Sequence, residues 1–564
     1  MAVVRDLEPA PALAPRRERP AAPSRESPLR KVLRQAYRDP LLLAFMAGAL
    51  IARIAFWVVT NRVFEDALIT ITHARNVPLG RGLVDHPGEG HIHAFTSALS
   101  VLIPLVGELI HEGAGLFAIR LASLAAVCVA LLYARLICRD LGIGTFPTAF
   151  VLAYLAFDQN MIFYGMAGME TQVAVAVLLA GVYHVHRHDF LAAGIWLGLA
   201  PLARPEFVLW IAPAFIYLAF MNARRSLMTA GIAAAVLAPW VVFTTAYYGS
   251  PIPNTIIAKA TISPTPPIVA NGSVLPWLSW LGQQTISQVA ILIYHLEPFK
   301  EVWYTVSAPI PWPVLDVVAI VMAYFLVLGL VASWNRRDLW PILAFLGLFF
   351  AYRVYFIPGI LYYEWYLPPF LGVLMLVVGL GMQRMSIKLP VPPKMLAVAL
   401  GVLFAVHMPF SFAIESRIQS VENQVHTNVA LYLKANVAPG ESVFSESSGY
   451  LAFYYGDVKL YDYPGLTSKV SVRALQALPP AHRQIPDLIA ALQPDWLVMR
   501  PWELQALDDE FPDIAGKYQT EKIFEMPGVP EADLNAQGAS GISFGGLVVA
   551  DTDMKFTVLK RKTP

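Results

Sequence analysis

Apolar residues recur along this chain in long runs, which differ from the short amphipathic patterns of a water-soluble domain. Runs long enough, or nearly long enough, to cross a bilayer begin near residues 41, 95, 116, 145, 171, 190, 207, 226, 314, 339, 368 and 395. After residue 414 the pattern changes to short strand-like runs separated by helical stretches, with strands expected at 442–446, 496–499 and 556–559. The pattern predicts a polytopic α-helical membrane protein followed by a soluble α/β domain.

Basic residues between the apolar runs determine how many of the runs cross the membrane. If all of them crossed, several basic clusters would lie outside, against the positive-inside rule. These clusters are Arg135/Arg139, His186-Arg187, Arg224-Arg225, Arg336-Arg337 and Arg384/Lys388/Lys394. Removing one early span moves all of them inside. The run at 95–112, which contains Pro104 and Glu108, is the first candidate for an amphipathic or re-entrant outer helix, and the short run at 145–157 is the alternative.

The resulting topology has about 11 transmembrane helices with the amino terminus inside. Residues 1–40 are rich in Pro, Ala and Arg and carry nine Lys/Arg against five Asp/Glu, which predicts a disordered cytoplasmic tail. Residues 41–414 form the transmembrane domain, with a long first outer loop at 61–115. Residues 415–564 form the outer α/β domain. We find no internal repeat of the kind that duplicated transporters show.

Composition agrees with this assignment and excludes other classes. Of the 564 residues, 57% are hydrophobic and 14% are charged, which is typical of polytopic membrane proteins. The formal net charge of +1 gives a nucleic-acid partner no electrostatic support. Cys128 and Cys138 stand ten residues apart on one expected helix, about 15 Å along its axis, so they cannot form a disulfide with each other.

An acidic pair, Glu65-Asp66, follows the first apolar run. Charge beside a bilayer is costly and is usually functional, although a solvated pair at the start of a loop helix would read the same way. Adjacent helical residues point in different directions, so one carboxylate can act while the other orients or binds. We expect a catalytic centre here.

Later outer segments, expected at 158–170, around 204–206, at 247–312 and at 353–367, bring further polar side chains to the same predicted face. Each has an ordinary structural explanation: a hairpin for Arg204 and Glu206, a snorkelling interfacial lysine, an aromatic belt or a helix cap. Together they suit an anionic lipid-linked substrate and a base. The candidate substrate-binding residues are Arg75, His93, Glu170, Arg204, Glu206, Asn254, Lys259 and Arg353.

Histidines in the first outer loop raise the question of a metal. His91 and His93 form an H-x-H pair, and His73 and His86 are near in sequence. Histidines in a polar loop are more often surface groups or substrate contacts, so we expect no protein-bound metal and no cofactor. The sequence contains neither a P-loop nor a G-x-G-x-x-G motif, and therefore nucleotide-driven chemistry has no support.

Several segments resemble the GT-C superfamily of integral-membrane glycosyltransferases, especially its arabinofuranosyl- and mannosyltransferase-like branch. The resemblance covers roughly residues 40–470. It rests on Phe64-Glu-Asp-Ala-Leu-Ile-Thr70, Ala74-Arg-Asn76, Gly80-Arg-Gly-Leu83, Pro87-Gly-Glu89, Phe95-Thr-Ser97, Gly168-Met-Glu-Thr171, Leu202-Ala-Arg-Pro-Glu206, Tyr248-Gly-Ser-Pro-Ile-Pro-Asn-Thr255, Ala258-Lys259 and Asp462-Tyr-Pro-Gly-Leu466.

The resemblance implies an inverting transfer of a single sugar from a polyprenyl-phosphate donor to a cell-envelope glycan, lipid or protein. It also implies a multi-pass protein of the bacterial inner membrane, with the active site and the C-terminal domain on the periplasmic side. Many relatives carry Asp-Asp or Asp-Glu where this chain has Glu65-Asp66. We favour Asp66 as the general base and Glu65 as an acceptor or sugar contact. Arg204, Lys259 and Arg353, with Arg75 in reserve, are the candidates to stabilise the departing phosphate.

Two other readings stay open. A transporter or flippase for a lipid-linked sugar would place ionisable residues in the middle of the membrane, whereas those of this chain cluster at loop edges. A glycan ligase with the same fold and a diphosphate lipid donor is not distinguished by the sequence. The segment Tyr450-Leu-Ala-Phe-Tyr-Tyr455 reads as a core strand of the outer domain, or as an aromatic platform for a sugar.

Overall fold

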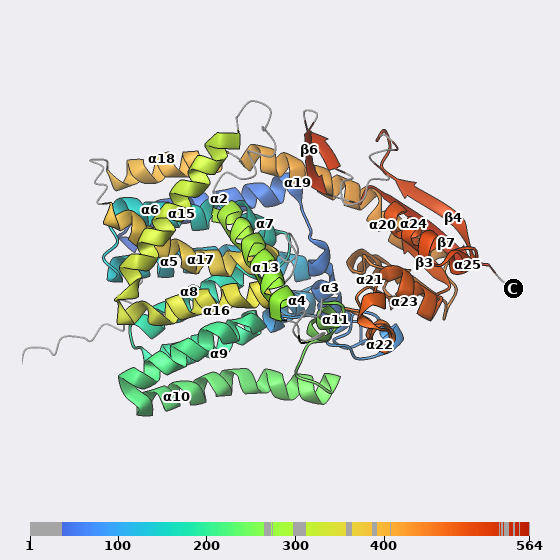
Figure 1. The fold of residues 1–564 in the computed structure, drawn as a ribbon, viewed down its shortest axis with the longest axis horizontal. Coiled ribbons are helices and arrows are strands. Elements are labelled where there is room, and N and C mark those ends of the chain that lie inside the picture. Colours follow the sequence, from blue (N-terminus) through green and yellow to red (C-terminus); the bar gives the residue numbers. More distant parts are fainter. Residues whose placement is uncertain are drawn as a thin grey trace, which may run out of the picture.

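The structure is a computed structural model in which membrane-length helices lie side by side and a smaller α/β domain covers one end of them (Figure 1). It describes residues 37–263, 272, 274–296, 312–356, 364–385, 392–406, 408–529, 531, 534, 541–544, 547–551 and 553–562. Residues 1–36, which make up nearly all of the predicted cytoplasmic tail, lie outside the described residues.

Long apolar helices build the larger part, and most begin within three residues of the starts that the apolar runs predict. They are α2 (Pro40–Thr60), α5 (Gly115–Asp140), α6 (Thr145–Phe157), α8 (Thr171–His186), α9 (Phe190–Ala203), α10 (Val208–Tyr248), α13 (Val274–Leu296), α15 (Trp312–Trp334), α16 (Trp340–Phe356), α17 (Leu367–Arg384) and α18 (Pro393–Ala405). Within the described residues, six helices are long and apolar enough to cross a membrane. The count of about 11 spans stays a prediction.

One predicted feature agrees with the structure, and one region contains a helix that the sequence does not predict. The apolar runs expected from residues 207 and 226 form the two parts of α10, which meet at a kink at Asn222. The chain turns back there, because the Ser226 hydroxyl donates to the carbonyl oxygen of Phe215 at 3.4 Å. The stretch 247–312, predicted as an outer segment, contains α13, which packs against α15 and α16. The sequence hides α13 because the glutamines and serines of its middle interrupt the apolar run.

The predicted outer helix at 95–112 is α4 (Ala98–Ile110), which has 13 residues. At 1.5 Å per residue it is about 20 Å long, too short to cross a bilayer. It packs against α3 (Glu65–Asn76) and α5, and it leaves Val106, Leu109 and Ile110 exposed. These features fit the amphipathic helix that the sequence predicts.

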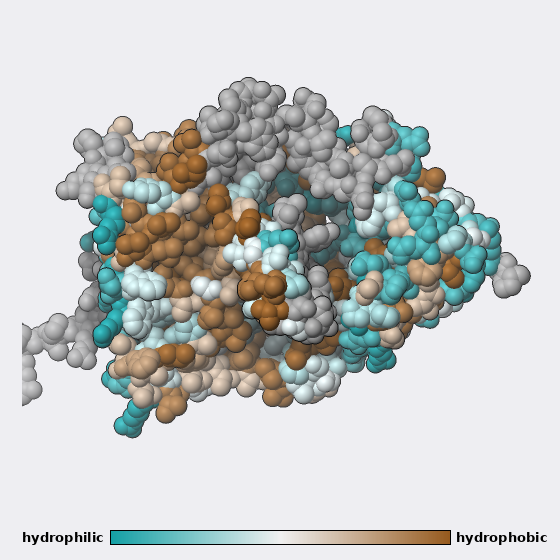
Figure 2. Space-filling view, viewed as in Figure 1, coloured by the Kyte–Doolittle hydropathy of each residue, from teal (hydrophilic) through white to brown (hydrophobic). Residues whose placement is uncertain are grey.

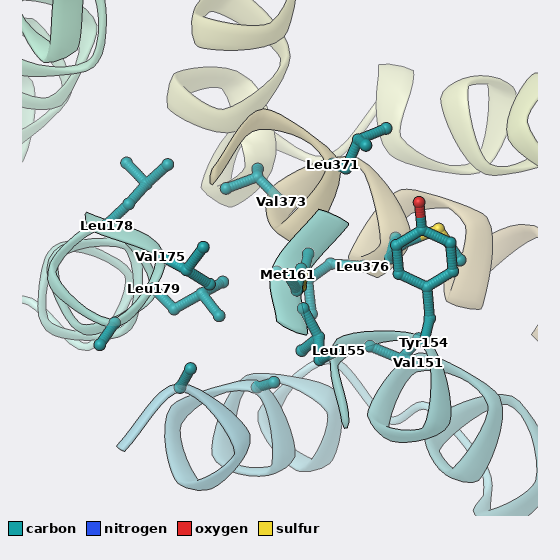
Figure 3. Packing of buried hydrophobic residues seen from close by; sticks show 14 of the residues in the cluster. Val151, Tyr154, Leu155, Met161, Val175, Leu178, Leu179, Leu371, Val373 and Leu376 are labelled. Atoms are coloured by element: carbon teal, nitrogen blue, oxygen red, sulfur yellow. The ribbon is translucent and has the colours of Figure 1, made fainter. Parts of the chain in front are cut away.

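The interior of the helical part is apolar and closely packed. Figure 3 shows side chains of α6, α7 (Gln159–Met166), α8 and α17 meeting around Leu155, Met161 and Leu376. Every residue of α17 from Leu367 to Met382 is buried, as expected for a helix surrounded by other helices. Small residues let backbones approach, since a Cβ atom on Gly198 of α9 would lie 2.7 Å from the carbonyl oxygen of Ala233 in α10.

Ion pairs show that three of the basic clusters, Arg135/Arg139, His186-Arg187 and Arg336-Arg337, lie at one end of the helices. Arg135 Nε lies 2.7 Å from Asp39 Oδ2, Arg187 Nη1 lies 3.6 Å from Asp140 Oδ2, and His186 Nδ1 lies 3.8 Å from Asp338 Oδ2. We call this the basic end. Figure 2 shows hydrophobic surface over the helices between hydrophilic residues at this edge and the hydrophilic C-terminal domain. That the basic end faces the cytoplasm stays a prediction.

The C-terminal domain contains a five-stranded sheet in the order β2-β1-β3-β7-β4. Its strands are β1 (Ser442–Ser445), β2 (Lys459–Tyr461), β3 (Trp496–Met499), β4 (Tyr518–Glu525) and β7 (Lys555–Arg561). Strand β1 pairs in parallel with β2 and β3, whereas β7 is antiparallel to β3 and β4. A separate hairpin joins β5 (Gly541–Phe544) and β6 (Leu547–Asp551). The three predicted strand segments are thus confirmed.

Helices complete the domain and tie it to the membrane part. They are α19 (Met408–Gln424), α20 (His426–Asn436), α21 (Gly449–Tyr455), α22 (Lys469–Ala477), α23 (Ile485–Leu492), α24 (Pro501–Glu510) and α25 (Pro512–Ala515). The strand reading of 450–455 is wrong, because these residues form α21. Helical spacing stacks the rings of Tyr450 and Tyr454, four residues apart, with centroids 6.1 Å from each other.

Candidate active site

The acidic pair opens helix α3 at the end of the bundle that carries the C-terminal domain. The Phe64 amide donates to the carbonyl oxygen of Ala167 at 2.9 Å, which fixes the start of the helix against α7. Glu65 and Asp66 occupy the first turn, where the helix dipole favours negative charge. Because successive helical residues are rotated by about 100°, the two carboxyl groups face different surroundings.

Asp66 faces a pocket between the membrane helices and the C-terminal domain. The pocket encloses about 460 Å³, including the space at its opening. Residues from α3, the 94–100 segment, α11 (Asn254–Ile262) and the C-terminal domain line it. The described lining residues are Asp66, Ile69, Thr70, Ala94, Phe95, Thr96, Ser97, Ser100, Met169, Glu170, Arg204, Thr255, Lys259, Trp365 and Leu466.

Arg204 is one of the two cations in this lining. It directly precedes Pro205, which disfavours helical backbone at position 204, and it leaves α9 in an extended conformation. Its side chain is almost fully buried. Nε lies 2.9 Å from Glu170 Oε1, and Nη2 donates to Thr171 Oγ1 at 3.0 Å. Arg204 is therefore fixed in place by the start of α8.

Lys259 on α11 is the second cation. Its ammonium lies 5.7 Å from the ring centroid of Trp365 and 5.9 Å from that of Tyr366, within the range of cation–π attraction. Burial lowers the pKa of Lys259, and the nearby Asp66 carboxylate opposes this shift. Burial likewise raises the pKa of Asp66, and Lys259 is the charge that opposes this shift most strongly. The two groups thus favour each other's ionised form.

Hydroxyl groups form a further part of the pocket lining, which we call the hydroxyl wall. They come from Thr70, Thr96, Ser97, Ser100 and Thr255. The Thr96 and Thr255 hydroxyl oxygens lie 2.9 Å apart and join the loop before α4 to α11. Ser97 caps α4 by accepting from the Ser100 amide at 3.3 Å. The quoted sequence motifs contain all of these hydroxyl residues except Ser100, although no motif shows that they meet at one pocket.

Glu65 is absent from the described pocket lining and faces the C-terminal domain. Its Oε2 accepts from the Ser447 hydroxyl at 3.2 Å, and its Oε1 accepts from the Gly449 amide at 3.1 Å. Burial and the neighbouring Glu446 and Asp66 carboxylates raise the pKa of Glu65 to about 8. The two adjacent carboxyl groups are thus divided between the pocket and the domain.

Asn254 and His93 hold segments of the chain that adjoin the pocket lining. The Asn254 side-chain amide donates to the carbonyl oxygens of Gly465 and Leu466 at 2.7 and 3.0 Å. Its backbone amide donates to the carbonyl oxygen of His93 at 2.8 Å. The buried His93 ring stacks on Tyr248 with centroids 4.9 Å apart, and burial lowers its pKa to about 3. These residues hold the chain that lines the pocket.

The remaining predicted residues lie at different distances from the pocket. Glu170 lines it, and the buried Glu206 lies 3.9 Å from Arg204 Nη1. Arg75 packs over the ring of Phe453 in the C-terminal domain, 5.2 Å from its centroid. Arg353 on α16 is buried, donates to Gln288 Oε1 at 2.9 Å and is absent from the described lining.

Both histidines of the H-x-H pair pack against aromatic rings. The ring of His91 stacks on Tyr247 with centroids 4.1 Å apart, as that of His93 does on Tyr248. In the part of the chain that the structure describes, no three His, Cys, Asp or Glu side chains are grouped closely enough to hold a metal ion.

Comparisons with known proteins bear on the fold. Residues 415–545 match a family model described as a domain of unknown function, DUF8728. A search of curated proteins gives no match. The crystal structure of ArnT from Cupriavidus metallidurans bound to undecaprenyl phosphate is similar, with a TM-score of 0.50 and 12% identity over 92% of this chain and 97% of that chain.

Two further structures give lower TM-scores. ArnT from Cupriavidus metallidurans in the apo state has a TM-score of 0.49 and 11% identity over 92% of this chain and 97% of that chain. The Archaeoglobus fulgidus oligosaccharyltransferase tethered with an acceptor peptide has a TM-score of 0.46 and 11% identity over 87% of this chain and 74% of that chain. The similarity to the ArnT structure bound to undecaprenyl phosphate, together with the helices and the sheet described above, shows a polytopic α-helical, GT-C-like membrane fold with a small C-terminal sheet domain.

Proposed function

We propose that the protein is a membrane glycosyltransferase that moves a single sugar from a polyprenyl-phosphate donor to a hydroxyl group of a cell-envelope acceptor, with inversion. The observation that carries this proposal is the pocket in which Asp66 faces Lys259 and Arg204 at one end of a GT-C-like fold. The ArnT structure of that fold was obtained with undecaprenyl phosphate, a lipid phosphate of the kind proposed here.

Asp66 is the proposed general base. The sugar–phosphate bond is already activated, so the protein has to remove the proton of the acceptor hydroxyl and stabilise the departing phosphate. The acceptor oxygen forms a bond to the anomeric carbon, its proton passes to the Asp66 carboxylate, and the electron pair of the breaking C–O bond goes to the lipid phosphate. The nearby Lys259 favours the ionised form of Asp66 that this role needs.

The charges of the pocket match a monophosphate donor. In the described lining, Asp66 and Glu170 balance Arg204 and Lys259. When Asp66 takes up the acceptor proton, the lining gains one net positive charge at the moment when the phosphodiester monoanion becomes a phosphate dianion. Fixed cations in a partly dry site stabilise such developing charge. A diphosphate donor would bring one more negative charge without a further cation in this lining.

The hydroxyl wall is the proposed contact surface for the sugar. Ser, Thr and an indole ring are suited to a neutral polyol, since hydroxyl groups both donate and accept and the ring packs against C–H faces.

A transporter is the alternative from another class, and Arg53 on α2 is the residue that could suggest it. This fully buried guanidinium donates to the carbonyl oxygen of Ala156 at 2.7 Å and to Gln172 Oε1 at 2.8 Å. Arg53 therefore satisfies the carboxyl end of α6, where cations are favoured, and has a structural explanation that requires no substrate path.

The test is donor consumption by the purified protein in proteoliposomes. Undecaprenyl-phosphate monosaccharides and undecaprenyl-diphosphate sugars, labelled in the sugar, are offered with a cell-envelope fraction as acceptor. We expect release of undecaprenyl phosphate and labelled acceptor from at least one monophosphate donor. Consumption of diphosphate donors alone would support the ligase, and movement of intact donor across the bilayer without transfer would support the transporter. Either result would overturn the proposal.

A further inference from the structure

The C-terminal domain turns one particular edge of its sheet toward helix α3. The segments that follow its parallel strands all emerge at this edge: 446–448 after β1, 462–468 after β2, and Arg500 after β3. The first of them contacts Glu65, and the second supplies Leu466 to the pocket lining. In open α/β sheets, ligands bind at the carboxyl ends of parallel strands.

Glu65 reaches this edge where the strand order changes direction. From β1 the chain passes to β2 on one side and later to β3 on the other, so the carboxyl ends of β1 and β3 flank a crevice. At the β1 side, Ser447 and Gly449 donate to the two carboxyl oxygens of Glu65. At the β3 side, Arg500 Nη2 lies 2.6 Å from Glu446 Oε2 and 3.3 Å from the Ser447 hydroxyl oxygen. A side chain of the membrane part thus occupies the place of a ligand.

Position 449 leaves no room for a larger residue. A Cβ atom on Gly449 would lie 2.8 Å from Glu65 Cγ, and it would also collide with the carbonyl oxygen of Glu65. The backbone of α21 therefore touches the first turn of α3 directly. A single added methyl group has to push the two elements apart.

A second contact fixes the chain just before α3. The buried Arg62 pairs with Glu415 of α19 at 3.0 Å and also with Glu422, to which Nη2 donates at 2.8 Å. The Tyr450 hydroxyl of α21 donates to the same Glu422 carboxylate at 2.6 Å. The C-terminal domain therefore contacts the chain through polar side chains at residue 62 and again at residue 65.

We infer that Glu65 is a positioning residue, whose carboxyl group is an internal ligand of the C-terminal domain and holds the first turn of α3 so that Asp66 faces the pocket. We call the contact of Glu65 with Ser447 and Gly449 the latch. The effect of the latch on sugar transfer rests on the proposed function. Its effect on the position of the first turn of α3 does not. The C-terminal domain thus orients the helix that carries Asp66.

The test compares Gly449→Ala with Gly231→Ala in the full-length protein. A Cβ atom at Gly231 meets nothing within 4 Å, so this exchange is a matched control. We expect Gly449→Ala to speed hydrogen–deuterium exchange at residues 66–72 about tenfold, the factor that corresponds to losing about one net hydrogen bond, and Gly231→Ala to leave it unchanged. Ser447→Ala should speed the exchange at residues 66–72 by a smaller factor. Ser447→Thr, which keeps the hydroxyl group, should exchange like the wild type.

Kinetics separate positioning from general destabilisation. We expect Gly449→Ala to lower kcat about tenfold while KM stays within twofold, because the base moves and the sugar contacts remain. Unchanged exchange at 66–72 in Gly449→Ala would overturn the latch. An equal change throughout the protein would overturn it as well. If the wild-type protein shows no transfer with any donor, the proposed function fails, and the exchange result still decides the latch.

Discussion

Two adjacent carboxyl groups of α3 stand in two different regions, and the contrast between them explains the site. Asp66 lies in the pocket, where the strongest charge on it is the ammonium of Lys259. Glu65 lies in the latch, where its hydrogen-bond donors are uncharged and the nearest carboxylates, Glu446 and Asp66, repel its negative form. Burial raises both pKa values, and only Asp66 has a cation as its main electrostatic neighbour. Under the proposed function, the different surroundings of the two carboxyl groups, and not their residue types, make Asp66 the base and Glu65 the positioning residue.

The largest effect is expected where the pocket loses its central cation. Arg204→Met leaves Glu170 and Glu206 buried without their partner, which costs about 3–5 kcal/mol for a broken buried pair. We expect a strongly lowered midpoint of thermal unfolding in detergent. Adding Glu170→Gln to Arg204→Met should recover part of the loss. If the single variant unfolds like the wild type, Arg204 does not hold the pocket together.

Lys259 provides the next effect and separates charge from packing. Lys259→Met keeps an apolar chain under the rings of Trp365 and Tyr366 and removes the charge beside Asp66. We expect kcat to fall by about 100-fold, the size typical of removing one group that stabilises transition-state charge, with little change in thermal unfolding. If kcat of this variant equals that of the wild type, a cation other than Lys259 stabilises the departing phosphate.

The latch should respond to pH in the opposite direction from an ordinary carboxylate contact. The pKa of Glu65 is about 8 in the folded protein and near 4.5 when exposed, so the folded protein holds a proton across that interval. The contribution of Glu65 to stability therefore falls as the pH rises from 4.5 through 8. Glu65→Gln cannot ionise, and we expect the ratio of its kcat to that of the wild type to increase above pH 8. A constant ratio from pH 6 to 9.5 would contradict a neutral latch.

The smallest effect is expected at the rim of the same interface. Arg81 Nη2 lies 2.9 Å from Asp457 Oδ1, and both side chains are substantially exposed. Exposed ion pairs contribute little, because water and salt screen them. We expect Arg81→Ala to leave the exchange of residues 66–72 and kcat within twofold of the wild type. A loss as large as that of Gly449→Ala would mean that the whole domain interface, and not the latch, orients α3.

The sequence predicts the helical part well because apolar runs are local signals. The starts of α2, α5, α8 and α17 follow from them, as do three strands of the C-terminal domain. Helix α13 is not predicted, because its glutamines and serines interrupt the apolar run. The helices that it packs against lie elsewhere in the sequence. Helix α6, the alternative candidate for the outer helix, is also visible, and its 13 residues, as many as α4 has, leave the number of spans open.

The candidate site is predicted only as far as charge reveals it. Asp66, Glu170, Arg204 and Lys259 stand out because ionisable residues are rare in such a chain, and the structure gathers them around one pocket. The latch leaves no trace in the sequence, because Ser447 is 382 residues from Glu65 and an ordinary Ser-Gly pair carries no signal. Arg353 stands out for the same reason, and it bonds Gln288 on α13 and is absent from the described pocket lining, so its role stays a prediction.

The most direct test of the account measures Asp66→Asn and Glu65→Gln side by side in the same transfer assay, at pH 7, with a donor that the wild-type protein consumes. Asp66→Asn should lose at least about 100-fold in kcat, the range typical of removing a general base. Glu65→Gln should stay within about tenfold of the wild type, because its amide can still accept from the Gly449 amide. Full transfer by Asp66→Asn, or a larger loss in Glu65→Gln than in Asp66→Asn, would contradict the division of roles between pocket and latch.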